Sequence, residues 1–276
     1  MKELVFLKLG GSLITDKSTP YTPLLDRMDA LALQIKSAQQ TRPNLHLLIG
    51  HGAGSFGHVP AREYKTRDGL PSTGRHGDAQ TVYWKGFVEV RQQAAALNRF
   101  VMDALYKADV RAIALPPSAS VVADNGSVTQ WELAPIRMAL AAQIIPVIFG
   151  DTVFDQTLGG TILSTEDLFM HLTDALRPDR ILLAGLEAAV WEDFPARARK
   201  VETITPASFN AIEHGIGASA AADVTGGMES KVRQMLDLVE RHPNLTAQIF
   251  SGERAGNLLR ALEGETLGTI ICADEK

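Results

Sequence analysis

Two glycine-rich turns near the start of the chain carry basic side chains of the kind that bind phosphate. The first is Lys8-Leu9-Gly10-Gly11-Ser12, with Lys17 a short distance beyond it, and the second runs from Gly50 to His58. Glycine lets the backbone approach an anion closely, and N–H groups that follow a buried strand converge on it. Lysine adds a fixed charge, and histidine adds a donor that can become charged near neutral pH. Together the turns predict two phosphate groups held face to face.

A third glycine motif lies toward the other end of the chain, in Asp223–Val232. Its pair Gly226-Gly227 precedes strong helical spacing, so free N–H groups at a helix start would face an anion. Lys231 follows one turn into that helix and can fold back over the same site. Each motif alone also fits an ordinary tight turn or a solvated lysine. The three together favour phosphoryl transfer, which requires positive charge and alignment more than covalent chemistry.

Phosphoryl transfer also requires an acidic residue that orients the lysines or holds Mg²⁺. We expect this residue to be Asp167, at a helix start within Ser164–Leu168, with Asp151 as a second candidate. Either aspartate also suits a helix cap or a turn. The chain contains neither the Walker sequence of P-loop enzymes nor the loop signatures of protein kinases.

Strand and helix patterns that alternate along the chain determine where these motifs lie. Apolar runs typical of buried parallel strands span 4–9, 45–50, 110–115, 144–149, 180–184, 246–250 and 267–272. Helical spacing covers 24–37, 78–107, 133–143, 165–176, 206–214, 228–241 and 255–262. This order predicts an α/β fold, an open three-layer αβα sandwich with a mainly parallel central sheet. Ligands bind beyond the carboxyl ends of such strands, where the first two glycine turns and Gly150-Asp151 lie.

Two further patterns concern turns and a boundary. Asp124–Ser127 and Gln156–Gly160 read as hairpin turns. The stretch 177–180 is the expected border between an N-terminal lobe, 1–177, and a C-terminal lobe, 178–276, that share one continuous sheet.

Composition is that of an ordinary globular protein and excludes several classes of partner. Of 276 residues, 45% are hydrophobic and 21% are charged, and the net charge of −5 argues against nucleic-acid binding. The single cysteine, Cys272, is too few for an internal disulfide or a thiolate metal site. The sequence shows no leader and no long apolar run. We therefore expect a cytoplasmic protein with no membrane contact and no metal held by protein ligands alone.

In order and spacing, the motifs resemble the amino acid kinase superfamily over nearly the whole chain. The resemblance rests on Lys8–Ser12 with Lys17, Gly52–His58, Gly150-Asp151, Ser164–Leu168 and Asp223–Lys231. Within that superfamily, the position of His58 resembles the isopentenyl phosphate kinases, in which the equivalent histidine binds the acceptor phosphate. The resemblance implies an amino acid kinase-like fold, use of ATP and Mg²⁺, and a homodimer. It also implies conversion of isopentenyl phosphate to isopentenyl diphosphate, in isoprenoid biosynthesis by an alternative mevalonate route.

The resemblance implies a role for each motif as well. The residues expected to contact ATP are Lys8, Gly10, Gly11, Ser12, Gly54, Gly185, Gly226, Gly227 and Lys231. Those expected to contact the acceptor are Gly52, Ala53, Gly54, His58, Gly150, Asp151 and Gly160. The expected catalytic residues are Lys8, Lys17, His58 and Asp167. The N-terminal lobe would hold the acceptor phosphate and part of the ATP phosphate site, and the C-terminal lobe would bind the nucleotide.

A phosphate acceptor explains why a histidine stands at position 58. A phosphate monoester is largely dianionic at neutral pH, with a second pKa of about 6, so its oxygen needs no general base. It needs a positive donor that offsets repulsion between like charges. An apolar tail would need an apolar pocket, which we assign to Tyr83, Trp84 and Phe87, although the same cluster also suits core or a dimer interface.

Two positions depart from the family pattern. Ala53 stands where the pattern has glycine, so its N–H remains available only if φ is negative. The stretch 184–191 lacks the Asp-Gly pair that the superfamily often carries near the nucleotide. The alternatives are a fosfomycin kinase-like or other small phosphonate or phosphate kinase, and a non-catalytic nucleotide-binding protein.

Overall fold

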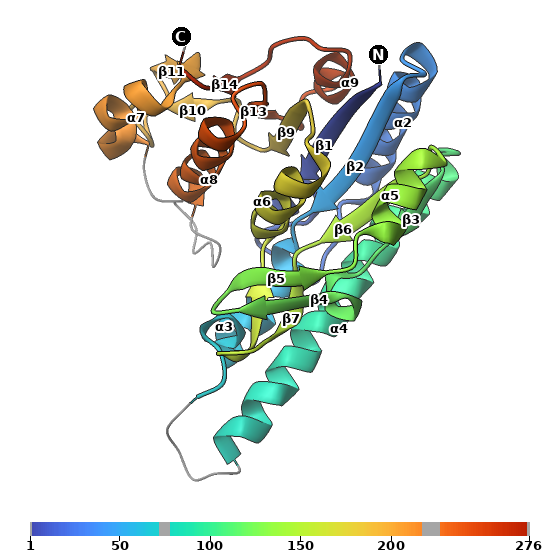
Figure 1. Ribbon diagram of the computed structural model, residues 1–276, viewed down its shortest axis with the longest axis vertical. Coiled ribbons are helices and arrows are strands. Elements are labelled where there is room, and N and C mark those ends of the chain that lie inside the picture. The colour runs from blue at the N-terminus through green and yellow to red at the C-terminus, as the bar shows by residue number, and fades with distance from the viewer. Residues whose placement is uncertain (1, 72–77, 217–226, 275–276) are drawn as a thin grey trace.

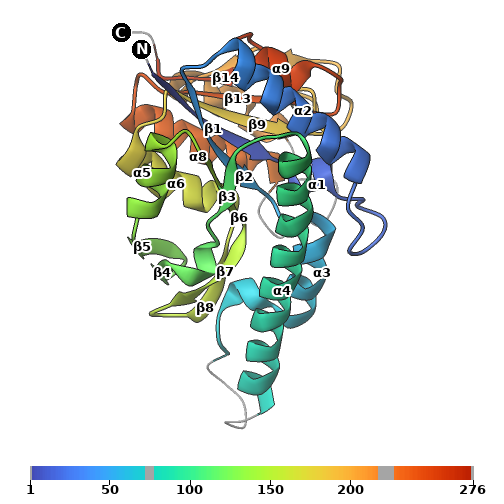
Figure 2. The same ribbon diagram turned by 90° about the vertical axis from the view of Figure 1, so that its right-hand side faces the viewer.

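The protein is described here by a computed structural model, which covers residues 2–71, 78–216 and 227–274. Within these ranges, eight strands form a central sheet in the order β12-β14-β13-β9-β1-β2-β6-β3. Helices lie on both faces of this sheet (Figures 1 and 2). Neighbouring strands from β13 to β3 are parallel, whereas β14 is antiparallel to β13. The expected αβα sandwich with a mainly parallel sheet is therefore confirmed.

The element bounds agree with the patterns in the sequence to within a few residues. The strands of the central sheet are β1 (Glu3–Leu9), β2 (Leu45–His51), β3 (Ala112–Ala114), β6 (Ile145–Phe149), β9 (Arg180–Gly185), β12 (Thr203–Ile204), β13 (Thr246–Ser251) and β14 (Thr269–Ile271). The helices are α1 (Gly11–Ile14), α2 (Leu25–Thr41), α3 (Gly54–Tyr64), α4 (Asp78–Lys107), α5 (Ala134–Ala141), α6 (Thr165–Leu176), α7 (Pro206–Ile212), α8 (Gly227–Arg241) and α9 (Asn257–Leu262). The short strands β10 (Val190–Trp191) and β11 (Lys200–Val201) pair with each other outside the central sheet.

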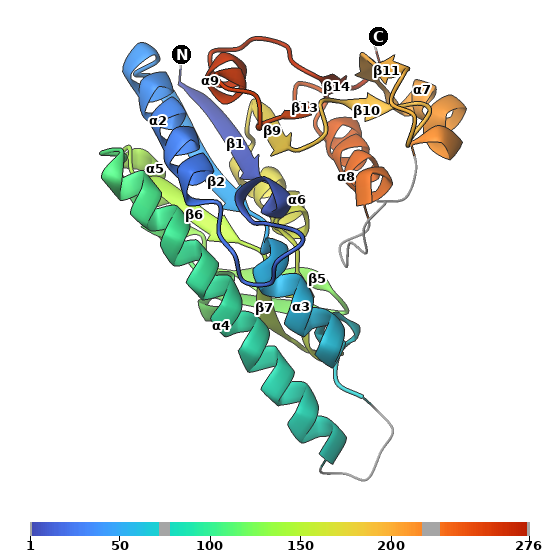
Figure 3. The same ribbon diagram turned by 180° about the vertical axis from the view of Figure 1, so that it is seen from behind.

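Alternating side chains of β1 divide the core into two layers. Val5, Leu7 and Leu9 pack with the buried faces of α2, α4 and α9, which Figure 3 shows on one side of the sheet. Phe6 packs on the other side, with α5, α6 and α8. Because neighbouring residues of a strand point to opposite faces, Lys8 lies on the same side as Phe6, toward α6 and α8.

A second, four-stranded sheet is built from the two hairpins that the turn signals predicted. It consists of β4 (Val121–Asp124), β5 (Ser127–Trp131), β7 (Asp151–Asp155) and β8 (Gly159–Leu163). Asp155 fixes both hairpins at once, because its carboxylate accepts backbone N–H groups of Asn125 and Gly126 in one turn and of Thr157 and Leu158 in the other. Figure 1 shows this sheet beside α3 and the middle of α4.

The segment after the second glycine turn differs from the expectation. It was expected to be a turn ending at His58, but Gly54–Tyr64 forms the helix α3, and His58 lies one turn inside it. Two glycines and Pro60 hide the helical pattern, since both residue types have low helix propensity. Packing against α4 stabilises the helix instead: a Cβ on Gly86 of α4 would lie 2.2 Å from the Tyr64 side chain.

None of the helices in the described ranges combines the length and the apolar character that crossing a membrane requires.

Candidate active site

A cavity of about 400 Å³ lies beyond the carboxyl ends of β1, β2, β6 and β9. It brings together most of the residues that the sequence singled out, from segments far apart in the chain. These are Lys8, Gly10, Gly11, Ser12, Lys17, Gly52, Ala53, Gly54, His58, Gly150, Gly185, Gly227 and Lys231. Gly226 lies outside the described residues, so its expected contact with ATP stays a prediction.

The two N-terminal glycine turns pack directly against each other at this cavity. A Cβ on Gly11 would lie 2.4 Å from the Gly54 nitrogen, and one on Gly52 would lie 2.8 Å from the Gly11 nitrogen. Thr15 links the turns, because its hydroxyl accepts the Ser55 N–H at 3.0 Å and donates to the Gly11 carbonyl at 2.8 Å. Only glycine allows backbones to approach this closely.

Ala53 meets the condition that a methyl group imposes on this turn. Its φ is −78°, so the Cβ is accommodated without strain. Gly54, the first residue of α3, has a φ of +50°, which favours glycine. The helix therefore begins at the cavity, with His58 one turn inside it. The N–H groups of Ser55, Phe56 and Gly57 already donate within the turn, to the Thr15 hydroxyl and the Ala53 carbonyl.

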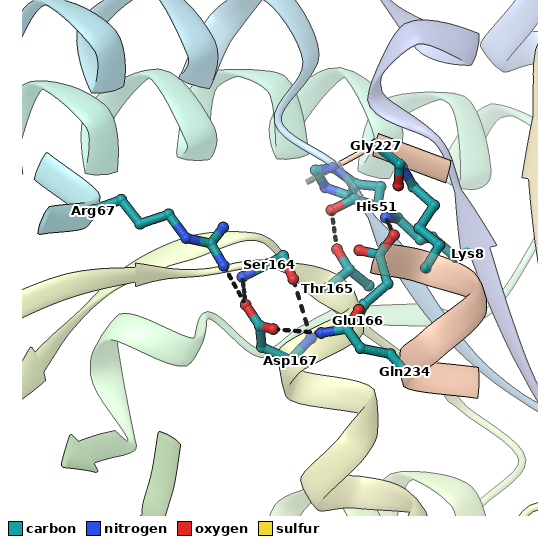
Figure 4. Close-up of polar contacts among 10 residues, drawn as sticks. Lys8, His51, Arg67, Ser164, Thr165, Glu166, Asp167, Gly227 and Gln234 are labelled. Carbon is teal, nitrogen blue, oxygen red and sulfur yellow. Dashed lines mark hydrogen bonds and ion pairs between the residues drawn. The ribbon is translucent and has the colours of Figure 1, made fainter. Parts of the chain in front are cut away.

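Glu166 is the acidic residue that pairs with a lysine of the cavity. Its carboxylate forms an ion pair with the Lys8 ammonium group, and both side chains are buried (Figure 4). Burial raises the pKa of this carboxyl, but the charges of Lys8 and Lys231 outweigh it, so the net shift is downward. Lys231 also donates to the Gly227 carbonyl at 3.1 Å, one turn back along α8. Glu166 is thus ionised between two lysines from different elements.

Asp167, which was expected to orient the lysines, has a different set of partners. It forms a capping box with Ser164: its carboxylate accepts the Ser164 N–H at 2.8 Å, and its own N–H donates to the Ser164 hydroxyl at 3.1 Å. The same carboxylate accepts from Arg67 at 3.2 Å and from Gln234 at 2.8 Å. The S-x-x-D pattern of Ser164–Asp167 was the available signal, because it assigns Asp167 to the helix cap and leaves Glu166 for the site.

The other end of the cavity is lined by residues that the sequence did not single out. Trp191, Phe194 and Arg197 lie there with Glu187. Glu187 accepts from Arg197 at 2.7 Å and from the Trp191 indole at 3.2 Å, and the hydrogen bond from Arg197 is the main reason that its pKa is lowered. The Arg197 guanidinium lies 4.8 Å from the centre of the Phe194 ring. Glu187 and Trp191 lie in the stretch 184–191, where the family's Asp-Gly pair is absent, and Phe194 and Arg197 follow it, so no motif pointed to them.

Asp151 and Gly160, which were expected to contact the acceptor, lie outside the lining of the cavity. Asp151 is fully buried, accepts the Ser118 N–H at 3.1 Å and lies 3.7 Å from Arg91. Burial raises the pKa of its carboxyl, against the lowering effect of Arg91. The Gly160 carbonyl accepts the Tyr83 hydroxyl at 2.6 Å. Neither Asp151 nor Gly160 is among the described residues that line the cavity.

The aromatic cluster expected around an acceptor tail also lies behind the cavity wall. Tyr83, Trp84 and Phe87 pack against one another, and burial raises the pKa of Tyr83 to about 12. Smaller apolar side chains of the described lining lie near His58 and come from three elements. They are Ala61 of α3, Val90 of α4 and Ile162 of β8.

With this geometry in view, comparison with known proteins identifies the family. The model of the amino acid kinase family matches residues 3–251. The chain belongs to this family. Kinase chemistry, for which this family is named, agrees with the basic glycine motifs around one cavity.

Relatives that match the chain over nearly its full length share the name isopentenyl phosphate kinase. The chain is 31% identical to the isopentenyl phosphate kinase of Methanocaldococcus jannaschii, over 97% of this chain and 98% of that protein. It is 32% identical to the isopentenyl phosphate kinase of Methanothermobacter thermautotrophicus, with the same coverage. A solved X-ray structure of isopentenyl phosphate kinase superposes with a TM-score of 0.82 at 29% identity, over 98% of this chain and 100% of that one.

Proposed function

We propose that the protein transfers the γ-phosphoryl group of ATP to the phosphate of isopentenyl phosphate and forms isopentenyl diphosphate. The observation that carries this proposal is the placement of His58 beside the packed glycine turns, in one cavity with Lys8, Lys17 and Lys231. The names of the relatives specify the acceptor, and the apolar lining at the His58 end suits its tail. The product would enter isoprenoid biosynthesis.

The residues of the cavity divide the chemistry between them. Gly11 and Ser12 present backbone N–H groups to the ATP phosphates, and Lys8 and Lys231 offset their charge. The Gly10 N–H instead donates to the Ala184 carbonyl at 2.8 Å, which holds the turn against β9. The start of α3 and His58 hold the acceptor phosphate. One of its oxygens forms a bond to the γ-phosphorus as the bond from that phosphorus to the β,γ-bridging oxygen breaks, and Lys17 stabilises the group in transit. Because the acceptor oxygen is already deprotonated, no side chain has to remove a proton.

Mg²⁺ fits this site as a companion of the nucleotide. No group of three or more His, Cys, Asp or Glu in the described ranges could hold a metal ion. Mg²⁺ is commonly bound through substrate phosphates and water with few carboxylates, and Glu166, the acid beside Lys8, is the carboxylate closest to hand. When bound, the ion would neutralise charge on the β- and γ-phosphates.

Three broader expectations join this proposal. The N-terminal lobe, 1–177, would bind the acceptor and the C-terminal lobe, 178–276, the nucleotide. A homodimer is supported by the exposed edge strand β3, where Ile113 is 44% exposed, and by Tyr106 at the end of α4, which is 85% exposed. A cytoplasmic location stays a prediction.

The test is ATP consumption by purified protein with Mg²⁺, with isopentenyl phosphate or fosfomycin as the acceptor. We expect rapid turnover of isopentenyl phosphate and its loss in His58→Ala. Preference for fosfomycin would overturn the acceptor and keep the phosphate site. ATP binding without turnover of either compound would favour a non-catalytic nucleotide-binding protein.

A further inference from the structure

Arg67 is held rigidly at the acceptor end of the cavity, although no motif pointed to it. It lies in a single 3₁₀ turn, Thr66–Asp68, which packs against α3, α4 and β8. The Thr161 hydroxyl donates to the Arg67 carbonyl at 2.9 Å, and the Tyr83 hydroxyl, which donates to the Gly160 carbonyl at 2.6 Å, lies 3.3 Å from the Thr66 carbonyl. The backbone of the turn is therefore fixed from two sides, and the side chain reaches the cavity lining that also contains His58.

The guanidinium group of Arg67 is only partly satisfied by protein atoms. One terminal nitrogen, Nη2, donates to Asp167 Oδ2 at 3.2 Å, as Figure 4 shows. The other, Nη1, is buried and has no hydrogen-bond partner among the described residues. An unmet donor of a charged group is costly, so a buried one calls for an explanation, and a bound ligand is one.

Asp167 fixes the direction of this donor. Its carboxylate is also held by the Ser164 N–H at 2.8 Å and by Gln234 at 2.8 Å, so it cannot turn to follow the arginine. Since the guanidinium is planar, a fixed bond at Nη2 also fixes the plane in which Nη1 offers its N–H groups. Gln234 lies on α8, one turn beyond Lys231, so the anchor rests on the same helix as a lysine of the nucleotide site.

We propose that Arg67 is an acceptor-binding residue whose Nη1 donates to an oxygen of the acceptor phosphate, and that Asp167 is its positioning residue. The inference rests on the proposed function for the identity of the acceptor. A dianionic acceptor beside the ATP phosphates is strongly repelled, because like charges a few ångströms apart are poorly screened inside a protein cavity. Arginine suits this place because its fork matches the oxygens of a phosphate group.

The test measures binding of inorganic phosphate and of isopentenyl phosphate by calorimetry without nucleotide, and then the KM of each substrate. The variants are Arg67→Gln, Arg67→Lys and Asp167→Asn. The control is Arg99→Gln, which removes the same charge from a side chain of α4 that is 78% exposed. We expect Arg67→Gln to weaken binding of both phosphate compounds by about 10- to 100-fold, with the KM for ATP within about twofold of wild type.

The other variants separate position from charge. Arg67→Lys should recover part of the affinity for phosphate, because it keeps the positive charge but lacks the two terminal nitrogens of the guanidinium group. It also supplies a folded variant if Arg67→Gln does not fold. Asp167→Asn should raise the KM for the acceptor less than Arg67→Gln does, and Arg99→Gln should match wild type.

Two results would overturn the inference. One is unchanged binding of inorganic phosphate in Arg67→Gln and Arg67→Lys. The other is weaker binding of isopentenyl phosphate with unchanged binding of inorganic phosphate, which would place Arg67 at the tail. Failure of the proposed function gives a different result, namely no turnover of isopentenyl phosphate by the wild type. In that case the binding of inorganic phosphate to wild type and to Arg67→Gln still tests whether Arg67 binds a phosphate group.

Discussion

Glu166 of α6 lies against Lys8 of β1 at the floor of the cavity, and the two side chains are only 3% and 9% exposed. A buried ion pair contributes little net stability, because desolvation offsets the attraction, but removing one partner leaves a charge that nothing compensates. The pair therefore fixes the place of the Lys8 ammonium group. Lys231 approaches the same carboxylate from α8, so Glu166 connects the first and third glycine motifs.

Glu166→Gln should lower both activity and stability. Lys8 and Lys231 would lose the negative charge between them, and a cation displaced by about 1 Å can cost roughly 100-fold in kcat. Breaking a buried pair on one side also costs about 3–5 kcal/mol of unfolding free energy. Steady-state kinetics and urea unfolding measure the two effects.

Glu166→Asp is the matched control for this prediction. It keeps the charge with a shorter side chain, so it should retain more activity and more stability than the glutamine variant. If Glu166→Gln retained the kcat of wild type, the ion pair would have no part in placing Lys8.

The close approach of the first two glycine turns makes Gly11 unusually sensitive to substitution. In Gly11→Ala, the new Cβ would meet the Gly54 nitrogen at 2.4 Å and its Cα at 2.6 Å. These are backbone atoms, so the turns must separate, and we expect a loss of about 1–3 kcal/mol in unfolding free energy, as for other overpacked sites.

Gly185→Ala is the comparison for stability. Gly185 lines the same cavity, but a Cβ there meets no atom within 4 Å. Its unfolding free energy should lie within about 0.5 kcal/mol of wild type. Equal stability of the two alanine variants would contradict the packing of the turns.

The layered fold was predictable because its signals are local. β1, β2, β6 and β9 are apolar runs that end in glycine or histidine turns, and α4 has the bounds that its spacing predicted. The helix α3 was not predictable, because glycine and Pro60 hide its pattern and contacts with α4 supply its stability. Such contacts join distant parts of the chain and leave no trace in a window of sequence.

The site was predictable at positions where close backbone packing requires glycine. It was less predictable where the role of a side chain depends on the residues that it contacts. Gly11, Gly52 and Gly54 could be found because nothing larger fits where the turns meet. Glu166 and Asp167 are neighbours of similar chemistry, and only the capping box distinguishes them. Arg67 and Arg197 could not be found, since each depends on a carboxylate that tertiary folding brings near.

The acceptor end of the cavity should respond to Ile162 rather than to the aromatic cluster. Ile162→Ala removes a side chain from the lining, so longer prenyl phosphates should gain in kcat/KM relative to isopentenyl phosphate. Tyr83→Phe instead leaves the Gly160 carbonyl without its donor, which should cost about 1–3 kcal/mol of stability and leave the preference for chain length unchanged. A change of preference in Tyr83→Phe alone would return the aromatic cluster to the tail pocket.

His51 should make the fold sensitive to mild acid. The side chain is fully buried, stacks on Phe149 and lies 3.2 Å from Asn98. Burial is the largest influence and lowers the pKa of the imidazole from 6.5, although hydrogen bonds with Gly52 and Asn98 act in the opposite direction. The unfolded chain therefore binds a proton at a higher pH than the folded chain does. Above pH 6.5 this difference costs nothing, but stability is lost as the pH falls from there toward the folded pKa, by up to about 1.4 kcal/mol per pH unit.

Urea unfolding of wild type and His51→Gln between pH 7.5 and 5 isolates this contribution, because carboxylates titrate equally in both proteins. The glutamine variant is expected to start less stable, since it loses the stacking on Phe149, and to lose less stability across the window than wild type does. His214→Gln removes an exposed histidine and should keep the slope of wild type. Parallel slopes for wild type and His51→Gln would show that His51 takes up its proton as readily in the folded protein as in the unfolded chain.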